Sequence, residues 1–284
     1  MTSTVTAFKR FVSPLLLAAM AGLTLPAAAQ TLKWGSGNKT ESETLQFGTK
    51  TASSVTLGAL SVTTSTTANS FWVYCLDPLN TASLPSAYTT VSLQNFITNT
   101  AAGSASYTTL FGATPYTNSN IQTSSADTGY RMRNTTQVYS NLVELYSHAY
   151  ADSLLSVKKS AAFQYAVWTI LGEDELRYSS STGGLKDTDT DTAFRTQADA
   201  YLTAITSNNW GSVNGANLSA MTSYSYQVFA ASPLGGSQTF LAVTKTSGGT
   251  VAEPGSLALA SLAAAGVLIT RRRKDKGSKA EAAA

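Results

Sequence analysis

The chain has 284 residues, of which 12% are charged and 43% are hydrophobic, and its formal net charge is +3 at pH 7. Eight of its nineteen lysines and arginines lie in residues 1–29 and 255–284, so residues 30–254 carry eleven basic and fourteen acidic side chains and a net charge of −3. This balance excludes a basic nucleic-acid-binding surface on the central region, and the single cysteine, Cys75, excludes an internal disulfide.

The N-terminal segment has the pattern of a secretory signal peptide. The pair Lys9-Arg10 precedes the apolar stretch 11–25, and small residues at Ala27 and Ala29 match the requirement of a signal peptidase. We expect residues 1–29 to be removed after Ala29. An uncleaved membrane anchor is the alternative, which is less favoured because two prolines and a glycine interrupt the apolar stretch.

Residues 31–76 are expected to form strands. Val55, Leu57 and Val62 alternate with small and polar residues, which is the period of a half-buried strand. A denser run, Phe71-Trp72-Val73-Tyr74-Cys75-Leu76, ends at Asp77-Pro78. Its alternation predicts that Cys75 shares a face with Val73 and that Tyr74 lies on the opposite face.

The middle of the chain, residues 77–210, is predicted to be irregular and then helical. A short strand near 89–93 and a helical turn near 93–100 are followed by three helices with apolar spacing of three and four residues. The first contains Val138, Leu142, Leu145 and Tyr146, the second spans 154–171, and the third spans 192–205 with Asp191 as its N-cap.

Strand patterns return in residues 211–247, at 224–229 and 238–243. Strands, then helices, then strands predict an α+β fold, with an antiparallel β-sandwich or barrel-like region and an inserted helical subdomain. The exported domain is therefore expected to span residues 30–247, and Gly248-Gly249 begins a linker into the C-terminal segment 248–284.

The C-terminal segment combines three features. Glu253 and Pro254 precede an apolar stretch of about 256–270, and a basic tail, 271–284, follows it. The stretch is short against the ~20 residues that a membrane helix needs. The tail begins with Arg271, Arg272 and Arg273, which would hold that end in the cytoplasm.

This arrangement resembles the PEP-CTERM sorting signal, with Ala252 in place of its first proline. The resemblance implies handling by an exosortase-type sorting enzyme, transient residence in the inner membrane, and a final location at the cell surface or outer membrane, or in the extracellular matrix, of a Gram-negative bacterium. An ordinary weak C-terminal anchor is the alternative.

Gln164 is a polar residue on an apolar helix stripe. Its neighbours on the stripe are Ala161 and Trp168, and a buried amide is costly unless its hydrogen bonds are satisfied or the amide has been consumed. A cysteine sulfur held against a glutamine side chain can displace ammonia to form an internal thioester. Paired with Cys75, Gln164 would provide such an acylating bond toward an amine on a partner.

The same two segments resemble the motifs of the thioester domains of bacterial surface adhesins. The first motif is matched by Tyr74-Cys75-Leu76-Asp77 and the second by Phe163-Gln164-Tyr165-Ala166-Val167-Trp168. The resemblance implies that Cys75 donates the sulfur and Gln164 the acyl group. It also implies a non-enzymatic role in adhesion to an amine-bearing surface or a polysaccharide matrix, for example in a biofilm. An inert structural protein of the exopolysaccharide, without a thioester, is the alternative.

Three other patterns each have a functional and a structural interpretation. His148 is the only histidine and hence the only candidate base for a cysteine hydrolase, although a solvated histidine at a helix end is the simpler interpretation. Asp187, Asp189 and Asp191 have the spacing of a calcium loop, but Thr192 replaces its glycine and Ala198 its glutamate, so we expect an acidic helix entry and no metal or cofactor. Several tyrosines were candidates for a glycan-binding surface: Tyr74, Tyr88, Tyr107, Tyr116 and Tyr130.

Overall fold

The structure is a computed structural model of the full chain. It describes residues 29–47, 50–65, 69–78, 80–98, 105–111, 117–118, 121–122, 130, 132–173, 175–178, 184–188, 191–233 and 236–246.

Six antiparallel strands close into a barrel. The hydrogen-bonded order is β1-β5-β9-β10-β4-β3, and β3 pairs back with β1 to complete the ring. The strands are β1 (Ala29–Trp34), β3 (Lys50–Thr64), β4 (Phe71–Cys75), β5 (Ser86–Ser92), β9 (Tyr224–Ala231) and β10 (Phe240–Lys245). The expected barrel-like region is therefore confirmed, and closure protects its strand edges from further pairing.

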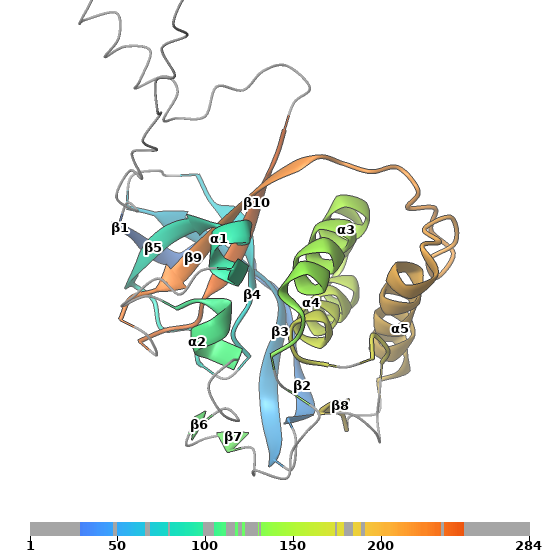
Figure 1. Ribbon diagram of the computed structural model, residues 1–284, viewed down its shortest axis with the longest axis horizontal. Coiled ribbons are helices and arrows are strands. Elements are labelled where there is room, and N and C mark those ends of the chain that lie inside the picture. The colour runs from blue at the N-terminus through green and yellow to red at the C-terminus, as the bar shows by residue number, and fades with distance from the viewer. Residues whose placement is uncertain are drawn as a thin grey trace, which may run out of the picture.

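The strand β3 belongs to two parts of the sheet. Its first part pairs with β2 (Lys39–Phe47), which in turn pairs with β8 (Leu185–Asp187), so the sheet extends beyond the barrel. Its last part, from Leu60 to Thr64, pairs with β4 and β1 inside the barrel. Figure 1 shows this long strand running between the barrel and the larger helices.

Three long helices lie on the other side of β3 from the barrel (Figure 1). They are α3 (Thr135–Ser153), α4 (Val157–Gly172) and α5 (Thr192–Ser207). The helix α4 is buried along thirteen of its sixteen residues because it lies between β2 and β3 on one side and α3 and α5 on the other. Its side chains and those of the barrel belong to one continuous hydrophobic core.

The remaining elements are short. They are α1 (Leu93–Thr98), α2 (Tyr107–Phe111), β6 (Thr117–Asn118) and β7 (Ile121–Gln122). The sequence pattern gave no signal for α2, β6, β7 or β8, each of which has five residues or fewer.

The predicted helices are confirmed with one shifted boundary. The second begins at Val157 rather than at Leu154, because the Ser156 side chain accepts a hydrogen bond from the Lys159 N–H and caps the helix there. The third begins after Asp191, whose carboxylate accepts from the N–H groups of Ala193 and Phe194 as expected of an N-cap.

The two targeting segments lie almost wholly outside the described residues. Of the signal-peptide prediction, Ala27 is outside and Ala29 is the first residue of β1. The sorting-signal residues Glu253, Pro254, Arg271, Arg272 and Arg273 and the stretch 256–270 are also outside. Within the described part of the chain, no helix has the length and apolar character needed to span a membrane.

Candidate functional site

The candidate site lies where β3 and β4 separate. The ladder between them pairs Val62 with Phe71 and Leu60 with Val73, and the same register would place Gly58 opposite Cys75. That pair does not form. At Gly58 the backbone has a φ of +122°, and a side chain there would meet the carbonyl oxygen of Lys39 on β2. The strand β3 therefore leaves β4 at this glycine, and a gap opens beside Cys75.

Side chains of α4 fill this gap. Ser160, Gln164 and Trp168 are spaced four residues apart, so they lie on one face of the helix. Ser160 Oγ accepts a hydrogen bond of 2.8 Å from the backbone N–H of Ala59 on β3, and Gln164 bonds to Cys75 on β4. We call this arrangement of Ala59, Cys75, Ser160, Gln164 and Trp168 the α4 fork.

Gln164 pairs with Cys75 as a strand neighbour would. The Cys75 N–H donates to Gln164 Oε1 at 2.8 Å, and Gln164 Nε2 donates to the Cys75 carbonyl oxygen at 2.8 Å. The Trp168 indole N–H donates to the same carbonyl at 3.0 Å. The side chains of Gln164 and Trp168 are completely buried. The structure thus brings together the two residues that the sequence selected, which lie 89 positions apart.

The Cys75 thiol and the Tyr74 hydroxyl have different partners: the thiol bonds to Gln238, and the hydroxyl bonds to serines next to or on α4. Cys75 Sγ donates to Gln238 Oε1 at 2.8 Å, while Gln238 Nε2 donates to the Asp77 carbonyl oxygen at 3.2 Å. Burial, together with the negative charge of Asp77, raises the pKa of the Cys75 thiol well above its ordinary value. The sulfur is therefore held as a neutral thiol at pH 7.

Tyr74 anchors the strand to the helices. Its hydroxyl bonds to Ser153 Oγ at 2.7 Å and to Ser160 Oγ at 3.0 Å, and its ring packs against Phe163 with a centroid distance of 4.6 Å. The predicted alternation along β4 is consistent with these contacts, because Tyr74 contacts the helices whereas the Cys75 sulfur contacts Gln238 on the chain leading into β10.

The two hydrogen bonds join the Gln164 amide to the backbone of Cys75, whereas the Cys75 sulfur bonds to Gln238. If a nucleophile attacked the amide carbon, negative charge would develop on Oε1, to which the Cys75 N–H donates. Burial excludes water from the amide, which strengthens this hydrogen bond and would slow hydrolysis of an acyl product. The Gln164 side chain is held in place at both of its polar ends, so its own motion is already restricted.

A cavity of 610 Å³ opens beside the site, and both Cys75 and Gln238 line it. The strands β1, β2 and β3, the loop between β1 and β2, and the segment after β4 contribute the remaining lining, including Trp34, Asn38 and Asn80. Gln164 itself is not part of that lining. Small molecules in this cavity therefore approach the pair from the sulfur side.

The structure does not join His148 to Cys75. His148 Nδ1 bonds to the carbonyl oxygen of Leu218 at 2.7 Å, and its ring stacks on Trp210 with an interplanar angle of 6°. Asp152, four residues further on, bonds instead to Lys159 and Tyr201. The expectation of a solvated histidine is wrong, because the ring is partly buried under Trp210.

The acidic triplet is divided between two places. Asp187 is buried on β8 and accepts a hydrogen bond from the Tyr178 hydroxyl, whereas Asp191 caps α5 and pairs with Lys158. Asp189 lies outside the described residues. Asp187 and Asp191 thus have separate structural partners, as expected of an acidic helix entry.

The tyrosines considered for a glycan-binding surface are in the core. Tyr74, Tyr88 and Tyr107 are completely buried and Tyr130 is 1% exposed, so this prediction is wrong for all four. Tyr116 lies outside the described residues. Their abundance in the sequence did not show that they are covered by the rest of the fold.

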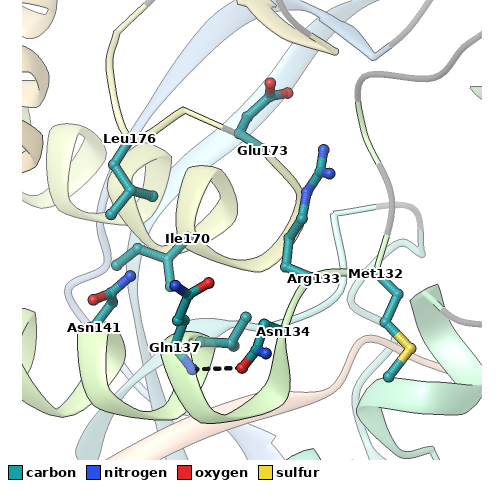
Figure 2. A pocket seen from close by; sticks show the side chains of 9 residues that line it. Met132, Arg133, Asn134, Gln137, Asn141, Ile170, Glu173 and Leu176 are labelled. Carbon is teal, nitrogen blue, oxygen red and sulfur yellow. Dashed lines mark hydrogen bonds between the residues drawn. The ribbon is translucent and has the colours of Figure 1, made fainter.

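A second pocket, of 500 Å³, lies between the start of α3 and the end of α4 (Figure 2). Figure 2 shows Arg133 and Glu173 at one side and the amides of Gln137 and Asn141 at the other. Arg133 Nε donates to the Gly172 carbonyl oxygen at 2.9 Å, which caps the C-terminus of α4. Cys75 is not among the residues that line this pocket. Two of its polar residues cap helix ends, Arg133 at the end of α4 and Asn134 at the start of α3.

Two residues of the site were missed from the sequence. Ser160 precedes Gln164 by one helical turn, so a second polar residue on the apolar stripe was a usable signal. Gln238 lies at the start of a predicted strand with no pattern to distinguish it, and only the pairing of β10 with β4 brings it to Cys75.

Comparison of the chain with protein-family models, with curated proteins and with solved structures finds no match.

Proposed function

We propose that this protein is a non-enzymatic, exported surface or matrix protein that attaches covalently to a partner through a thioester between Cys75 and Gln164. One observation carries the chemical part: the buried Gln164 amide is held by two hydrogen bonds of 2.8 Å to the backbone of the residue that carries the thiol, Cys75. The signal-peptide pattern and the PEP-CTERM-like tail support export and sorting to the cell surface.

The bond-forming step balances without an added reagent. Cys75 Sγ attacks Gln164 Cδ, an S–C bond forms, and the charge on Oε1 is stabilised by the Cys75 N–H. The C–Nε2 bond then breaks, and ammonia leaves with the proton that the thiol gave up. Because Gln164 is buried, the product is protected from water until an amine reaches it.

The intact mass of the secreted protein tests this proposal. We expect a mass lower by one ammonia than the sequence requires, and an adduct after treatment with methylamine. Cys75→Ala should abolish both, whereas Gln227→Ala, at an exposed glutamine on β9, should retain both. Full expected mass, together with one thiol that titrates in denaturant, would contradict the proposal.

The sorting part is tested separately. Replacement of Arg271, Arg272 and Arg273 by alanine should leave the protein in the inner-membrane fraction or release it unsorted. Replacing Lys274, Lys276 and Lys279 further along the same tail is the control for loss of charge alone. Unchanged surface exposure of the triple-arginine variant would contradict PEP-CTERM-type sorting.

A structural protein without a reactive bond is the second candidate. It is favoured by the fact that Gln164 has a hydrogen-bond partner at both its oxygen and its nitrogen while it remains an amide. Such a protein would be retained in the exopolysaccharide matrix without covalent attachment. Cys75→Ser would then leave its surface retention unchanged.

A further inference from the structure

The cavity beside Cys75 has a feature that depends on the state of the sulfur. In the thiol state, Gln238 Oε1 accepts the S–H at 2.8 Å. A thioester sulfur carries no hydrogen, so this oxygen would lose its donor. Gln238 does not turn away easily, because its Nε2 is bonded to the Asp77 carbonyl oxygen. Acylation of the sulfur therefore leaves a fixed carbonyl oxygen without a donor at the wall of the cavity.

We infer that this cavity is the binding site for the amine partner, that Gln238 positions the amine through its carbonyl oxygen, and that the amine is carried by a sugar ring. The inference rests on the proposed thioester. The incoming N–H would donate to Gln238 Oε1 and so replace the lost S–H donor. Held there, the amine would lie beside the sulfur of the thioester, from which side it would attack Gln164 Cδ.

The transfer step is balanced. The amine nitrogen forms a bond to Gln164 Cδ, the C–Sγ bond breaks, and one proton passes from the nitrogen to Sγ. The products are an amide on the Gln164 side chain and a Cys75 thiol. That thiol again donates to Gln238 Oε1, which is the arrangement the structure shows. Gln238 thus has a donor before and after the reaction.

The absence of a base among the lining residues of the cavity, all of which the structure describes, favours a weakly basic amine. None of its thirteen lining residues, all of which the structure describes, is charged. Asp77 is 1% exposed and accepts a hydrogen bond from Asn80, so its carboxylate does not line the cavity. A lysine amine, with a pKa of about 10.4, is an ammonium ion at pH 7 and would need a base. An amino group on a sugar ring is less basic because neighbouring oxygens withdraw electrons.

The lining also matches a sugar ring in shape and polarity. Trp34 is 45% exposed and offers a flat aromatic surface for the C–H face of a pyranose. Asn38 is fixed by a bond of 2.9 Å from the Ser61 N–H to its Oδ1, which leaves its nitrogen as a donor. Asn80 donates through Nδ2 to Asp77, which leaves its carbonyl as an acceptor. Such amide groups pair with ring hydroxyls.

Amine-transfer rates test the inference. Adduct formation on the thioester form is followed by mass spectrometry with glucosamine, methylamine and Nα-acetyllysine amide. We expect glucosamine to react fastest at pH 7. The ratio of glucosamine to methylamine rates should fall about tenfold in Trp34→Ala, since a stacking contact is lost. It should not fall in Leu155→Ala, a control residue that is 71% exposed at the end of α3.

Gln238→Met tests the positioning role, because methionine is similar in size but offers no carbonyl acceptor. We expect its thioester to form, as judged by the resting mass, and to react at least tenfold more slowly with glucosamine. An unchanged rate would overturn the role of Gln238. Faster reaction of the lysine derivative, or an unchanged ratio in Trp34→Ala, would overturn the sugar assignment.

Failure of the thioester itself is distinguished by a noncovalent measurement. In Cys75→Ala, which cannot form the bond, saturation-transfer NMR should still detect glucosamine in the cavity, and the signal should be lost when Trp34→Ala is added. A resting wild-type mass without loss of ammonia would overturn the proposed function. Absence of the NMR signal in Cys75→Ala would overturn the sugar-binding cavity.

Discussion

The helix α4 touches the sheet in two places that differ in chemistry. Near its N-terminus, Lys158 bridges Glu41 on β2, at 2.5 Å, and Asp191 at the start of α5, and the Lys158 side chain is 46% exposed. Two and six residues further along α4, Ser160 and Gln164 of the α4 fork bond to backbone groups of β3 and β4 through neutral hydrogen bonds that are completely buried.

This comparison shows which of the two contacts holds α4 more firmly against the sheet. An exposed ion pair contributes little, because water and salt screen it. A buried backbone group that loses its only partner costs its full desolvation energy. The α4 fork therefore fixes the position of α4 against the barrel, and it does so at the two residues proposed to react. The contact of Lys158 with Glu41 and Asp191 places charge at the surface, and it includes Asp191, the N-cap of α5.

Of the variants that follow, Gln164→Ala should lower the free energy of unfolding most. It leaves the Cys75 N–H without its partner and opens a cavity in the core. The free energy of unfolding should fall by about 3–5 kcal/mol in urea titrations. Gln227→Ala, exposed on β9, should change it by less than about 0.5 kcal/mol. A loss below about 1 kcal/mol for Gln164→Ala would show that the α4 fork is not the main constraint.

Gly58→Ala tests the divergence of β3 from β4. Alanine would be strained at the backbone φ of +122°, and its Cβ would clash with the Lys39 carbonyl oxygen. We therefore expect the free energy of unfolding, measured by thermal unfolding, to fall by about 2–3 kcal/mol. Gly37 is the matched control, since its φ is +80° and nothing lies within 4 Å of an added Cβ. Gly37→Ala should cost about 1 kcal/mol from the backbone alone. Equal losses in the two variants would contradict the tight approach at Gly58.

Ser160→Ala removes the partner of the Ala59 N–H and one partner of the Tyr74 hydroxyl. The expected loss in the free energy of unfolding is about 1–3 kcal/mol. Ser140→Ala, on the exposed face of α3, is the control and should be neutral within about 0.5 kcal/mol. If Ser160→Ala is as stable as Ser140→Ala, water or another group must accept the hydrogen bond from the Ala59 N–H.

The charged contact gives the smallest effects. Lys158→Ala should cost less than about 1 kcal/mol and should cost less still in high salt. Asp191→Ala removes the N-cap of α5 and should cost about 1 kcal/mol. A salt-independent loss above about 2 kcal/mol for Lys158→Ala would reverse the ranking of the two contacts.

The Asp191 effect should depend on pH. The hydrogen bond from Lys158, followed by the N–H groups of Phe194 and Ala193, lowers the pKa of Asp191. A carboxyl group with a lowered pKa in the folded state stabilises the fold above its unfolded value of about 3.9. That stabilisation is lost as the pH falls through the folded pKa. The stability gap between wild type and Asp191→Ala should therefore be constant from pH 5 to 7 and narrow below about pH 4.

Much of this architecture follows from local patterns in the sequence. The three long helices were predictable because their apolar residues recur every three or four positions, and Asp191 was a recognisable cap. The strand bearing Cys75 was predictable from its alternation. Cys75 and Gln164 could be paired in advance because each was chemically unusual in its own element.

The rest depended on contacts that are distant in sequence. The separation of β3 from β4 is set by the backbone at Gly58, and no strand pattern marks which glycine turns a strand away from its neighbour. Gln238 reaches Cys75 only through the pairing of β10 with β4. The number of tyrosines in the sequence did not show whether they lie on a surface, and the structure buries Tyr74, Tyr88, Tyr107 and Tyr130 in the core.

The most direct test of the Cys75–Gln164 bond is peptide mapping of the secreted protein under acidic digestion. We predict a linked pair of peptides, one containing Cys75 and the other Gln164, whose mass is one ammonia below their sum. A phosphine reductant, which contains no thiol, should leave the pair intact, and hydroxylamine should separate it. Recovery of the two peptides unlinked and at full mass, with Cys75 as a thiol and Gln164 as an amide, would contradict the account.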